Sequence, residues 1–191
     1  MAKLGTHGGA GKLRIIGGQW RSRLIEFDGG GSVRPTPDRV RQTFFDWLMP
    51  VIEGARCLDL FAGSGALGLE ALSRGARHCT FCETAPRAQA HIKTSLLALG
   101  ARAYDMVNMD GLYYLSQTWH RYAVVFLDPP FDSDLLGRAL ADLPKVLAPE
   151  GSRICLEWPE GKKPELPAGY EWLREKQAGQ VCFGLLTYVP P

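Results

Sequence analysis

The sequence predicts an α/β fold, with a mostly parallel sheet covered by helices on both faces and an antiparallel hairpin at the C-terminal end. From residue 56 onward, short strand-like runs alternate with helical stretches, which is typical of parallel sheets with crossover helices. The run YAVVFL at 122–127 is apolar without alternation, as expected for a central strand covered on both faces. A chain of 191 residues is long enough for one such domain with a small appendage.

The N-terminal part predicts that appendage. Residues 1–11 are rich in glycine and are expected to be disordered. Residues 12–32 contain two short apolar-alternating runs separated by Gly17-Gly18, which predict a small basic β-hairpin that ends in a flexible joint at 29–32. Thr36-Pro37-Asp38 then predicts a helix, with Thr36 as the N-cap and Pro37 at the first helical position. The main domain is expected over 33–191.

The elements of the main domain follow one another in a regular order. Strands are predicted at 56–61, 78–83, 103–109, 122–127 and 153–158, and helices at 66–74, 86–99, 111–118 and 133–147. The tail predicts two antiparallel strands around Ala178-Gly179. In such a sheet, ligands bind beyond the carboxyl ends of the strands, so the residues that follow each strand are the first candidates for chemistry.

Composition narrows the class of protein. No run approaches the roughly 18 apolar residues of a membrane span, and the N-terminus lacks the apolar core of a signal peptide, so we expect a cytoplasmic protein without a membrane partner. Residues 1–41 hold eight Lys and Arg against three acids, whereas the remaining 150 residues hold 14 basic and 17 acidic side chains. This asymmetry predicts a binding surface for a polyanion next to a separate active site. A solvated basic tail explains the composition equally well.

The five scattered cysteines suit a reducing compartment. Cys79 and Cys82 form a C-x-x-C pair, but they fall on a predicted strand, where residues three apart face opposite sides. No second pair follows at the spacing of a zinc ribbon. We therefore expect no metal site.

A glycine-rich turn follows the first strand of the main domain. Gly63, Gly65 and Gly68 form G-x-G-x-x-G between a strand and a helix, where glycines allow a ligand to approach free backbone N–H groups. This motif is compatible with a dinucleotide. Asp59, at the end of the strand, would however repel a pyrophosphate and attract an ammonium group, which disfavours NAD.

Two more acids end the next two strands. Glu83 stands where a carboxylate can accept both hydroxyls of a ribose, and Asp110 stands where it can meet an adenine amino group. Both acids can instead cap the helices that follow them. Three carboxylates at successive strand ends suit a ligand with a cationic amino-acid end, a ribose and an adenine.

The tetrapeptide Asp128-Pro129-Pro130-Phe131 follows the predicted central strand. Two prolines without N–H groups keep the loop out of helix and sheet, so the Asp128 carboxylate and the Pro129 carbonyl can be held toward one point. Two acceptors that bind an exocyclic amine would draw its nitrogen toward tetrahedral geometry and stabilise the charge that develops there. Phe131 offers a face on which a base can stack. A helix-capping loop explains the prolines but not the flanking Asp and Phe.

Together, DLFAGSGALGLEALSRGA, Glu83 and DPPF resemble the class I S-adenosylmethionine-dependent methyltransferases, which have a Rossmann-like sheet of seven strands. RIIGGQWRSR, RPTPDRVRQTFFDWL and REKQAGQV are similar to segments of the bacterial enzymes that methylate guanine N2 in 16S ribosomal RNA. The resemblance covers the chain from about Lys12 onward. DPPF is shared with adenine-N6 and cytosine-N4 enzymes, so the guanine assignment rests on the flanking segments.

The resemblance implies a role for each matching position. The implied cofactor is S-adenosylmethionine, with S-adenosylhomocysteine as product, and the implied partner is 16S ribosomal RNA or a partly assembled small subunit, bound by a monomer. The implied cofactor-binding residues are Thr36, Asp59, Phe61, Gly63, Ser64, Gly65, Glu83, Thr84, Met109 and Asp110. The implied catalytic residues are Asp128, Pro129, Pro130 and Phe131. The implied RNA-binding residues are Lys12, Arg14, Trp20, Arg21, Arg23, Arg34 and Arg39.

Three alternatives remain open. An amino-methyltransferase of adenine or cytosine, in DNA or RNA, would keep the chemistry, although sequence-specific DNA enzymes usually need a separate domain to read the duplex. A catalytically silent RNA-binding assembly factor would be favoured if Asp59 or Asp128 were missing, and both are present. An NAD-dependent dehydrogenase needs a hydride-handling site that the sequence does not display.

Overall fold

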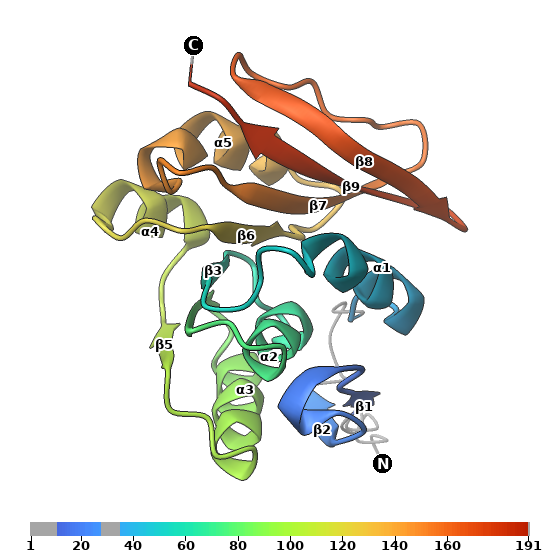
Figure 1. Ribbon diagram of the computed structural model, residues 1–191, viewed down its shortest axis with the longest axis vertical. Helices are drawn as coiled ribbons and strands as arrows, with labels where there is room; N and C mark the ends of the chain where they lie inside the picture. Colours follow the sequence, from blue (N-terminus) through green and yellow to red (C-terminus); the bar gives the residue numbers. More distant parts are fainter. Residues whose placement is uncertain (1–10, 28–34, 191) are drawn as a thin grey trace, which may run out of the picture.

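The computed structural model describes residues 11–27 and 35–190 and contains a seven-stranded sheet with the order β5-β4-β3-β6-β7-β9-β8 (Figure 1). The first five strands of that order run parallel, and β9 is antiparallel to both β7 and β8. This arrangement confirms the predicted α/β fold with its antiparallel C-terminal hairpin. The strands are β3 (Arg56–Asp59), β4 (His78–Cys82), β5 (Tyr104–Val107), β6 (Val124–Leu127), β7 (Arg153–Pro159), β8 (Tyr170–Ala178) and β9 (Val181–Tyr188).

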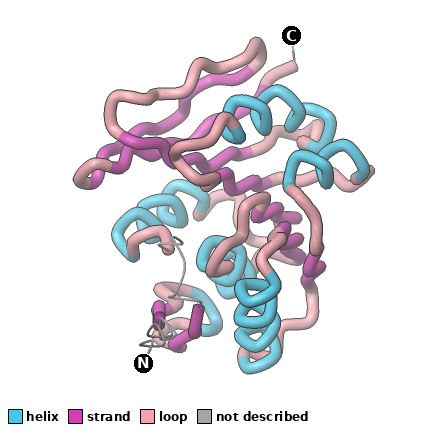
Figure 2. Tube along the Cα trace, turned by 180° about the vertical axis from the view of Figure 1, so that it is seen from behind, coloured by secondary structure: helices cyan, strands magenta, loops and turns pink. Residues whose placement is uncertain are grey.

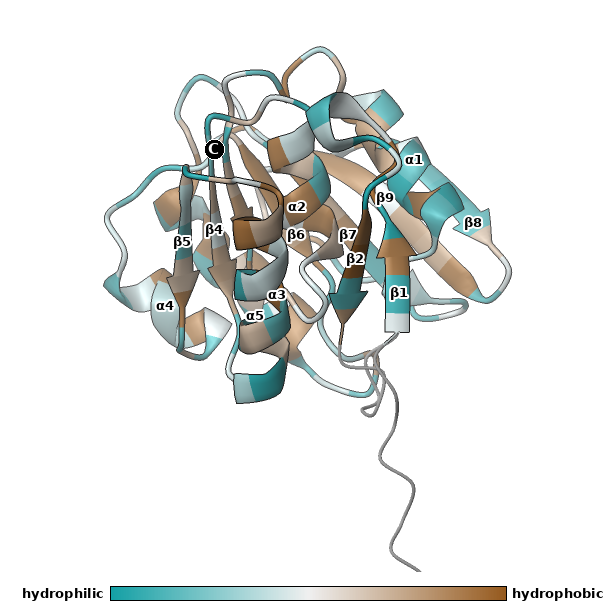
Figure 3. Ribbon diagram, turned by 90° about the horizontal axis from the view of Figure 1, so that it is seen from below, coloured by the Kyte–Doolittle hydropathy of each residue, from teal (hydrophilic) through white to brown (hydrophobic). Residues whose placement is uncertain are grey.

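Helices cover both faces of the sheet (Figures 1 and 2). Along β6, Val124 and Phe126 join one apolar core and Val125 and Leu127 join the other, because successive side chains of a strand point to opposite faces. In Figure 3 the apolar strands lie behind the helices of one face of the sheet. The first core is covered by α1 (Asp38–Leu48), α2 (Ala66–Ser73) and α3 (Pro86–Ala98), and the second by α4 (Gly111–Gln117), α5 (Leu135–Asp142) and the 3-10 helix η2 (Leu143–Val146).

The predicted start of α1 is wrong by one residue. The helix begins at Asp38, Pro37 takes the N-cap position, and no side chain caps it. The Thr36 hydroxyl donates instead to Asp128 Oδ2, 3.4 Å away, so a contact with a distant loop has taken the place of the local cap. The helix predicted at 133–147 also differs, because α5 begins only at Leu135 and tightens into η2.

The predicted N-terminal hairpin is confirmed. It consists of β1 (Gly11–Arg14) and β2 (Leu24–Phe27), which pair antiparallel with Leu13 opposite Ile25. The connection contains the 3-10 helix η1 (Gly18–Trp20). Gly18 has a φ of 77°, and a Cβ there would overlap the backbone of Ser73 on α2, so the hairpin is docked closely on that helix. Gly11, at the end of the segment 1–11 that the sequence predicts as disordered, is the first residue of β1 instead, because it pairs with Phe27. The predicted joint at 29–32 and residues 1–10 lie outside the described residues.

A buried acid on α2 holds the hairpin in place. Glu70 accepts hydrogen bonds from the backbone N–H groups of Ile16 and Gly17, each at 2.8 Å, and from Arg74 Nε at 2.7 Å. The fully buried Arg41 of α1 lies 3.9 Å from Glu70 and donates to the Arg14 carbonyl at 2.9 Å. Two charges buried this deeply are tolerated only when they are paired, so this network joins the hairpin to α1 and α2.

Candidate active site

A cavity of about 580 Å³ lies at the carboxyl ends of the parallel strands, the edge at which open α/β sheets bind their ligands. This volume is within the usual range for small-molecule sites. Gly65 is the one predicted cofactor residue that does not line it. The predicted residues that do line it are Thr36, Asp59, Phe61, Gly63, Ser64, Glu83, Thr84, Met109, Asp110, Asp128, Pro129, Pro130 and Phe131.

Each glycine of the G-x-G-x-x-G motif is required for its own physical reason. Gly63 and Gly65 adopt positive φ angles of 51° and 75°, and Gly65 is the N-cap of α2. A side chain is strained in that conformation. At Gly68 the constraint is packing, because a Cβ would overlap the Phe81 ring. The Gly68 N–H also donates to Asp59 Oδ2 at 3.0 Å, so the glycine motif supports the acid that precedes it.

Asp59 is a buried acid, with 3% of its surface exposed. Loss of solvent raises its pKa to about 7, the Gly68 N–H opposes that shift, and the charges of Asp128 and Glu83 add to it. A carboxyl poised in this way regains its charge when a cation binds beside it. The cavity thus holds a group suited to an ammonium ligand.

Glu83 and Asp110 bind the backbone as well as lining the cavity. Glu83 accepts from the N–H groups of Gly63 and Ala85, one on each carboxylate oxygen and each at 2.8 Å. Each oxygen retains a second lone pair for a ligand. Asp110 is the N-cap of α4 and accepts from the Tyr113 N–H at 3.0 Å. The helix-capping role therefore holds for Asp110, next to its place at the cavity.

The DPPF loop follows β6. Burial raises the pKa of Asp128 to about 6, while the hydrogen bond from Thr36 lowers it. The loop turns at Pro130, whose carbonyl accepts from the Ser133 N–H at 3.1 Å and from Ser133 Oγ at 2.6 Å. Within the described residues the Pro129 carbonyl accepts no hydrogen bond, and the Phe131 ring is 41% exposed. A carboxylate, an unused carbonyl and an exposed aromatic face therefore lie next to one another.

The sequence analysis missed Glu157, which lies on β7 beside this loop. Leu127 pairs with Leu156, so Asp128 and Glu157 are the next residues on adjacent parallel strands. Glu157 is 4% exposed, and burial together with the charge of Asp128 raises its pKa well above its usual value. The signal in the sequence is a single acid within RICLEW, a strand that is otherwise apolar apart from Arg153 at its start.

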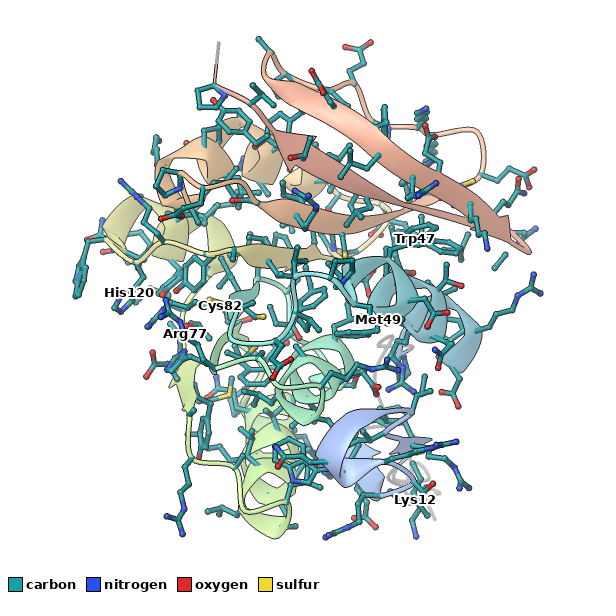
Figure 4. All side chains as sticks on the ribbon, in the orientation of Figure 1. Lys12, Trp47, Met49, Arg77, Cys82 and His120 are labelled. Carbon is teal, nitrogen blue, oxygen red and sulfur yellow. The ribbon has the colours of Figure 1, made fainter. Side chains whose placement is uncertain are left out.

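The predicted RNA-binding residues divide into two groups. Lys12, Arg14 and Arg21 are exposed on the hairpin, and Figure 4 shows Lys12 there. Arg23 is also exposed, but it donates to the Ala98 carbonyl at the end of α3, at 3.0 Å, and Trp20 is half-buried against the first core. Both of these side chains thus contribute to the docking of the hairpin.

On α1, Arg39 is exposed. Arg34 lies outside the described residues.

A second cleft of about 400 Å³ runs beside the hairpin. Lys12 and Arg14 line it, together with Pro35 and Thr36. The last two residues also line the larger cavity. The basic surface of the hairpin is therefore continuous with the site that contains Asp128.

The cysteines are buried or half-buried thiols. Cys79 belongs to the first core and Cys82 to the second, as expected for residues three apart on a strand, and burial raises the pKa of both thiols. Across 11–27 and 35–190 no cluster of His, Cys, Asp and Glu is arranged to hold a metal ion. In the same ranges no helix is long and apolar enough to cross a membrane.

Known proteins are similar in sequence to this chain over most of its length. The family model described as conserved hypothetical protein 95 matches residues 13–187. The ribosomal RNA small subunit methyltransferase D of Escherichia coli is 43% identical over 182 residues, which cover 94% of this chain and 92% of that protein. The protein of the same name from Haemophilus influenzae is 38% identical over 191 residues, which cover 97% of this chain and 98% of that protein.

Two solved structures that are similar to this chain are also described as methyltransferases. The putative methyltransferase YhhF of Escherichia coli has a TM-score of 0.84 at 42% identity, covering 93% of this chain and 98% of that one. A putative methyltransferase solved in complex with SAH, SMU.776, has a TM-score of 0.72 at 13% identity over 99% of this chain and 58% of its own, and so shares the fold. The chain therefore belongs to the conserved hypothetical protein 95 family, together with the ribosomal RNA small subunit methyltransferases D.

Proposed function

We propose that this protein transfers a methyl group from S-adenosylmethionine to the N2 amino group of a guanine in 16S ribosomal RNA. The observation that carries the proposal is one cavity lined by both the DPPF loop and the acid-ended strands. Methylation of small-subunit ribosomal RNA is supported by the names of relatives at 43% and 38% identity. The choice of guanine N2 rests on the resemblance of 14–23, 34–48 and 174–181 to guanine-N2 enzymes.

The residues of the cavity fit this cofactor. The Asp59 carboxyl would hold the ammonium of its methionine part, and the free lone pairs of Glu83 would accept the ribose hydroxyls. Met109 and Asp110 line the part of the cavity beyond β5, where adenine would lie. When bound, S-adenosylmethionine supplies an electrophilic methyl group on a sulfonium sulfur.

The DPPF loop would hold the target amine. The Asp128 carboxylate and the Pro129 carbonyl accept its two N–H bonds, which directs the nitrogen lone pair toward the methyl donor. Phe131 stacks on the base once the base has left its helix. Because the pKa of Asp128 is about 6, the carboxylate is mostly ionised at neutral pH, and it can take the proton that the methylated amine releases.

The hairpin would bind the RNA backbone. Lys12, Arg14 and Arg21 neutralise phosphates there, and the cleft at Thr36 leads from them toward the cavity. The proposed substrate is free 16S ribosomal RNA or a partly assembled small subunit, modified by a cytoplasmic monomer.

The test uses purified protein with tritium-labelled S-adenosylmethionine. Its substrates are unmethylated 16S RNA, small-subunit particles from a strain that lacks the gene, and DNA. We expect label in the RNA or in the particles, and mass mapping should locate one N2-methylguanosine. Label in DNA, adenine or cytosine would overturn the base assignment. RNA binding without any label would identify a silent assembly factor.

A further inference from the structure

Glu157 is a buried acid that the chemistry described above does not use. It lies on β7 next to Asp128, because the register Leu127–Leu156 places the two acids side by side on adjacent parallel strands. Its side chain is 4% exposed, and it does not line the cavity. Glu157 can therefore act on a substrate only through a neighbour.

The surroundings of Glu157 do not compensate a negative charge. The groups that face it are Asp128, directly after β6, whose charge raises the pKa of Glu157, and the Thr36 hydroxyl from the segment before α1, whose smaller effect lowers that pKa. Phe183 is its register partner on β9. Cys155, on the same strand, is a buried thiol. Within the described residues no Lys, Arg or His lies within 4.0 Å of the Glu157 carboxyl.

Hydrogen bonding leads to the same conclusion. The Thr36 hydroxyl has a single proton and donates it to Asp128 Oδ2, so it cannot serve both acids at once. Glu157 Oε1 is buried without any hydrogen-bond partner in the described residues. If Glu157 were ionised, a second negative charge would be buried beside Asp128, and one of its oxygens would have no donor. If Glu157 is protonated, its O–H group is a donor among neighbouring oxygen atoms that can accept.

We propose that Glu157 is a positioning residue, which stays protonated and so leaves Asp128 as the single ionised carboxyl of the pair. The inference rests on the proposed function, in which Asp128 accepts from the target amine. Two adjacent buried acids hold one negative charge more readily than two. The pKa of Glu157 is raised well above its usual value with Asp128 as a cause, so at neutral pH the proton stays on Glu157 and the charge on Asp128.

Two variants separate this role from a structural one. Glu157→Gln is neutral and still a donor, so its kcat should stay within roughly threefold of the parent, and the acid limb of kcat/KM should keep its midpoint. Glu157→Leu removes the donor. Its kcat should fall about tenfold and its acid limb should move to higher pH, with unchanged affinity for S-adenosylmethionine and an equal or higher Tm.

The opposite results would overturn the inference. If Glu157 were ionised in the working enzyme, Glu157→Gln would remove a like charge, and the acid limb would move to lower pH. Equal losses in the Gln and Leu variants would also show that charge is needed. A Leu variant with the parental kcat and pH profile would show that Glu157 positions nothing. If the Leu variant does not fold, the midpoint of the Gln variant alone decides.

A measurement without substrate separates this inference from the proposed function. The infrared difference spectrum of parent minus Glu157→Gln at pH 7 should contain the signal of a protonated buried carboxyl, and the difference of parent minus the control Glu171→Gln, at an exposed residue, should not. The Asp59 carboxyl, whose pKa is about 7, contributes equally to all three proteins and cancels. If that signal is present but the parent methylates no RNA, the proposed function fails and the protonation of Glu157 stands. If RNA is methylated but the signal is absent, the inference alone fails.

Discussion

The Thr36 hydroxyl donates a hydrogen bond to Asp128 Oδ2 over 3.4 Å, and it joins two segments that lie 92 residues apart in the sequence. The contact connects the chain just before α1 to the DPPF loop. It also opposes the effect of burial on the pKa of Asp128. The charge of the DPPF loop therefore depends on a residue from the N-terminal part of the chain.

Replacing Thr36 with Val should raise the pKa of Asp128, because the variant lacks the hydrogen bond that favours the carboxylate. The carboxylate is then protonated at higher pH, so the acid limb of kcat/KM should move up by about half to one pH unit. Thr36→Ser keeps the hydroxyl and should keep the parental limb. A pH–rate profile of the three proteins measures this, and coincident limbs for Val and parent would contradict it.

Replacing Asp128 with Asn keeps the size of the side chain and removes the charge. We expect kcat to fall by about 100-fold or more, since one preorganised acceptor for the developing charge is weakened. Binding of S-adenosylmethionine, measured by calorimetry, should be retained. The control is Asp134→Asn, at an exposed acid just before α5. Near-parental turnover in the Asp128 variant would remove Asp128 from the reaction.

Replacing Asp59 with Asn should stabilise the fold and weaken the binding of S-adenosylmethionine. Its pKa in the folded protein is about 7, above the unfolded value of about 4. Its contribution to stability is thus complete below about pH 4 and lost as the pH rises through about 7. Asp59→Asn can still accept from Gly68. We expect the variant to gain about 1–3 kcal/mol of stability at pH 8 and much less at pH 5.

The same variant should bind S-adenosylmethionine at least tenfold more weakly, by the loss of about 1.4 kcal/mol or more from a charge-assisted contact. Urea unfolding at the two pH values measures the stability, and calorimetry measures the affinity. A variant that is less stable than the parent at pH 8 would show that the buried charge is compensated.

Two glycines in helices should respond in opposite ways to alanine. Gly68→Ala pushes a methyl group into the Phe81 ring and should cost about 1–3 kcal/mol. Gly137 lies within α5, and no atom stands within 4 Å of the point that a Cβ would occupy there, so Gly137→Ala should stabilise by about 0.5–1 kcal/mol. Denaturant unfolding compares them. Equal effects of the two changes would mean that the contact with Phe81 relaxes at no cost.

The exposed arginines of the hairpin should control RNA affinity. Changing both Arg14 and Arg21 to Gln should weaken binding and reduce the slope of log K against log salt by about 2, roughly one unit for each phosphate that is no longer neutralised. Lys163→Gln is the control, because Lys163 pairs with Glu175 on the edge strand β8, far along the sheet. An unchanged slope in the double variant would exclude the hairpin from the RNA contact.

Most of the fold could be predicted from local patterns. Parallel strands buried on both faces have short apolar runs, and the helices between them have a clear periodicity, so β4 and α3 were each predicted within one residue of their observed ends. The acids at strand ends were found in the same way, because the carboxyl ends of parallel strands meet at one edge. The order of strands and helices along the sequence was sufficient to predict these features.

What escaped prediction depends on contacts between distant segments. Thr36 was expected to cap α1, yet its partner is Asp128. Trp20 and Arg23 are predicted to bind RNA, and the sequence did not indicate their contacts with the first core and with the Ala98 carbonyl at the end of α3. Glu157 becomes informative only through the register of β6 and β7. None of these pairings has a signal in the local sequence.

Glu70 fixes the hairpin to α2 through the backbone N–H groups of Ile16 and Gly17. The α2 helix carries Glu70 in its middle and begins directly after the glycine turn at Gly65. Its eight residues span only about 12 Å, so one short helix joins the proposed phosphate-binding surface to the proposed point of methyl transfer. If the hairpin binds phosphates as proposed, a nucleotide would be selected by its spacing from the bound backbone, and an RNA that presents its amine at another spacing would be bound without being modified.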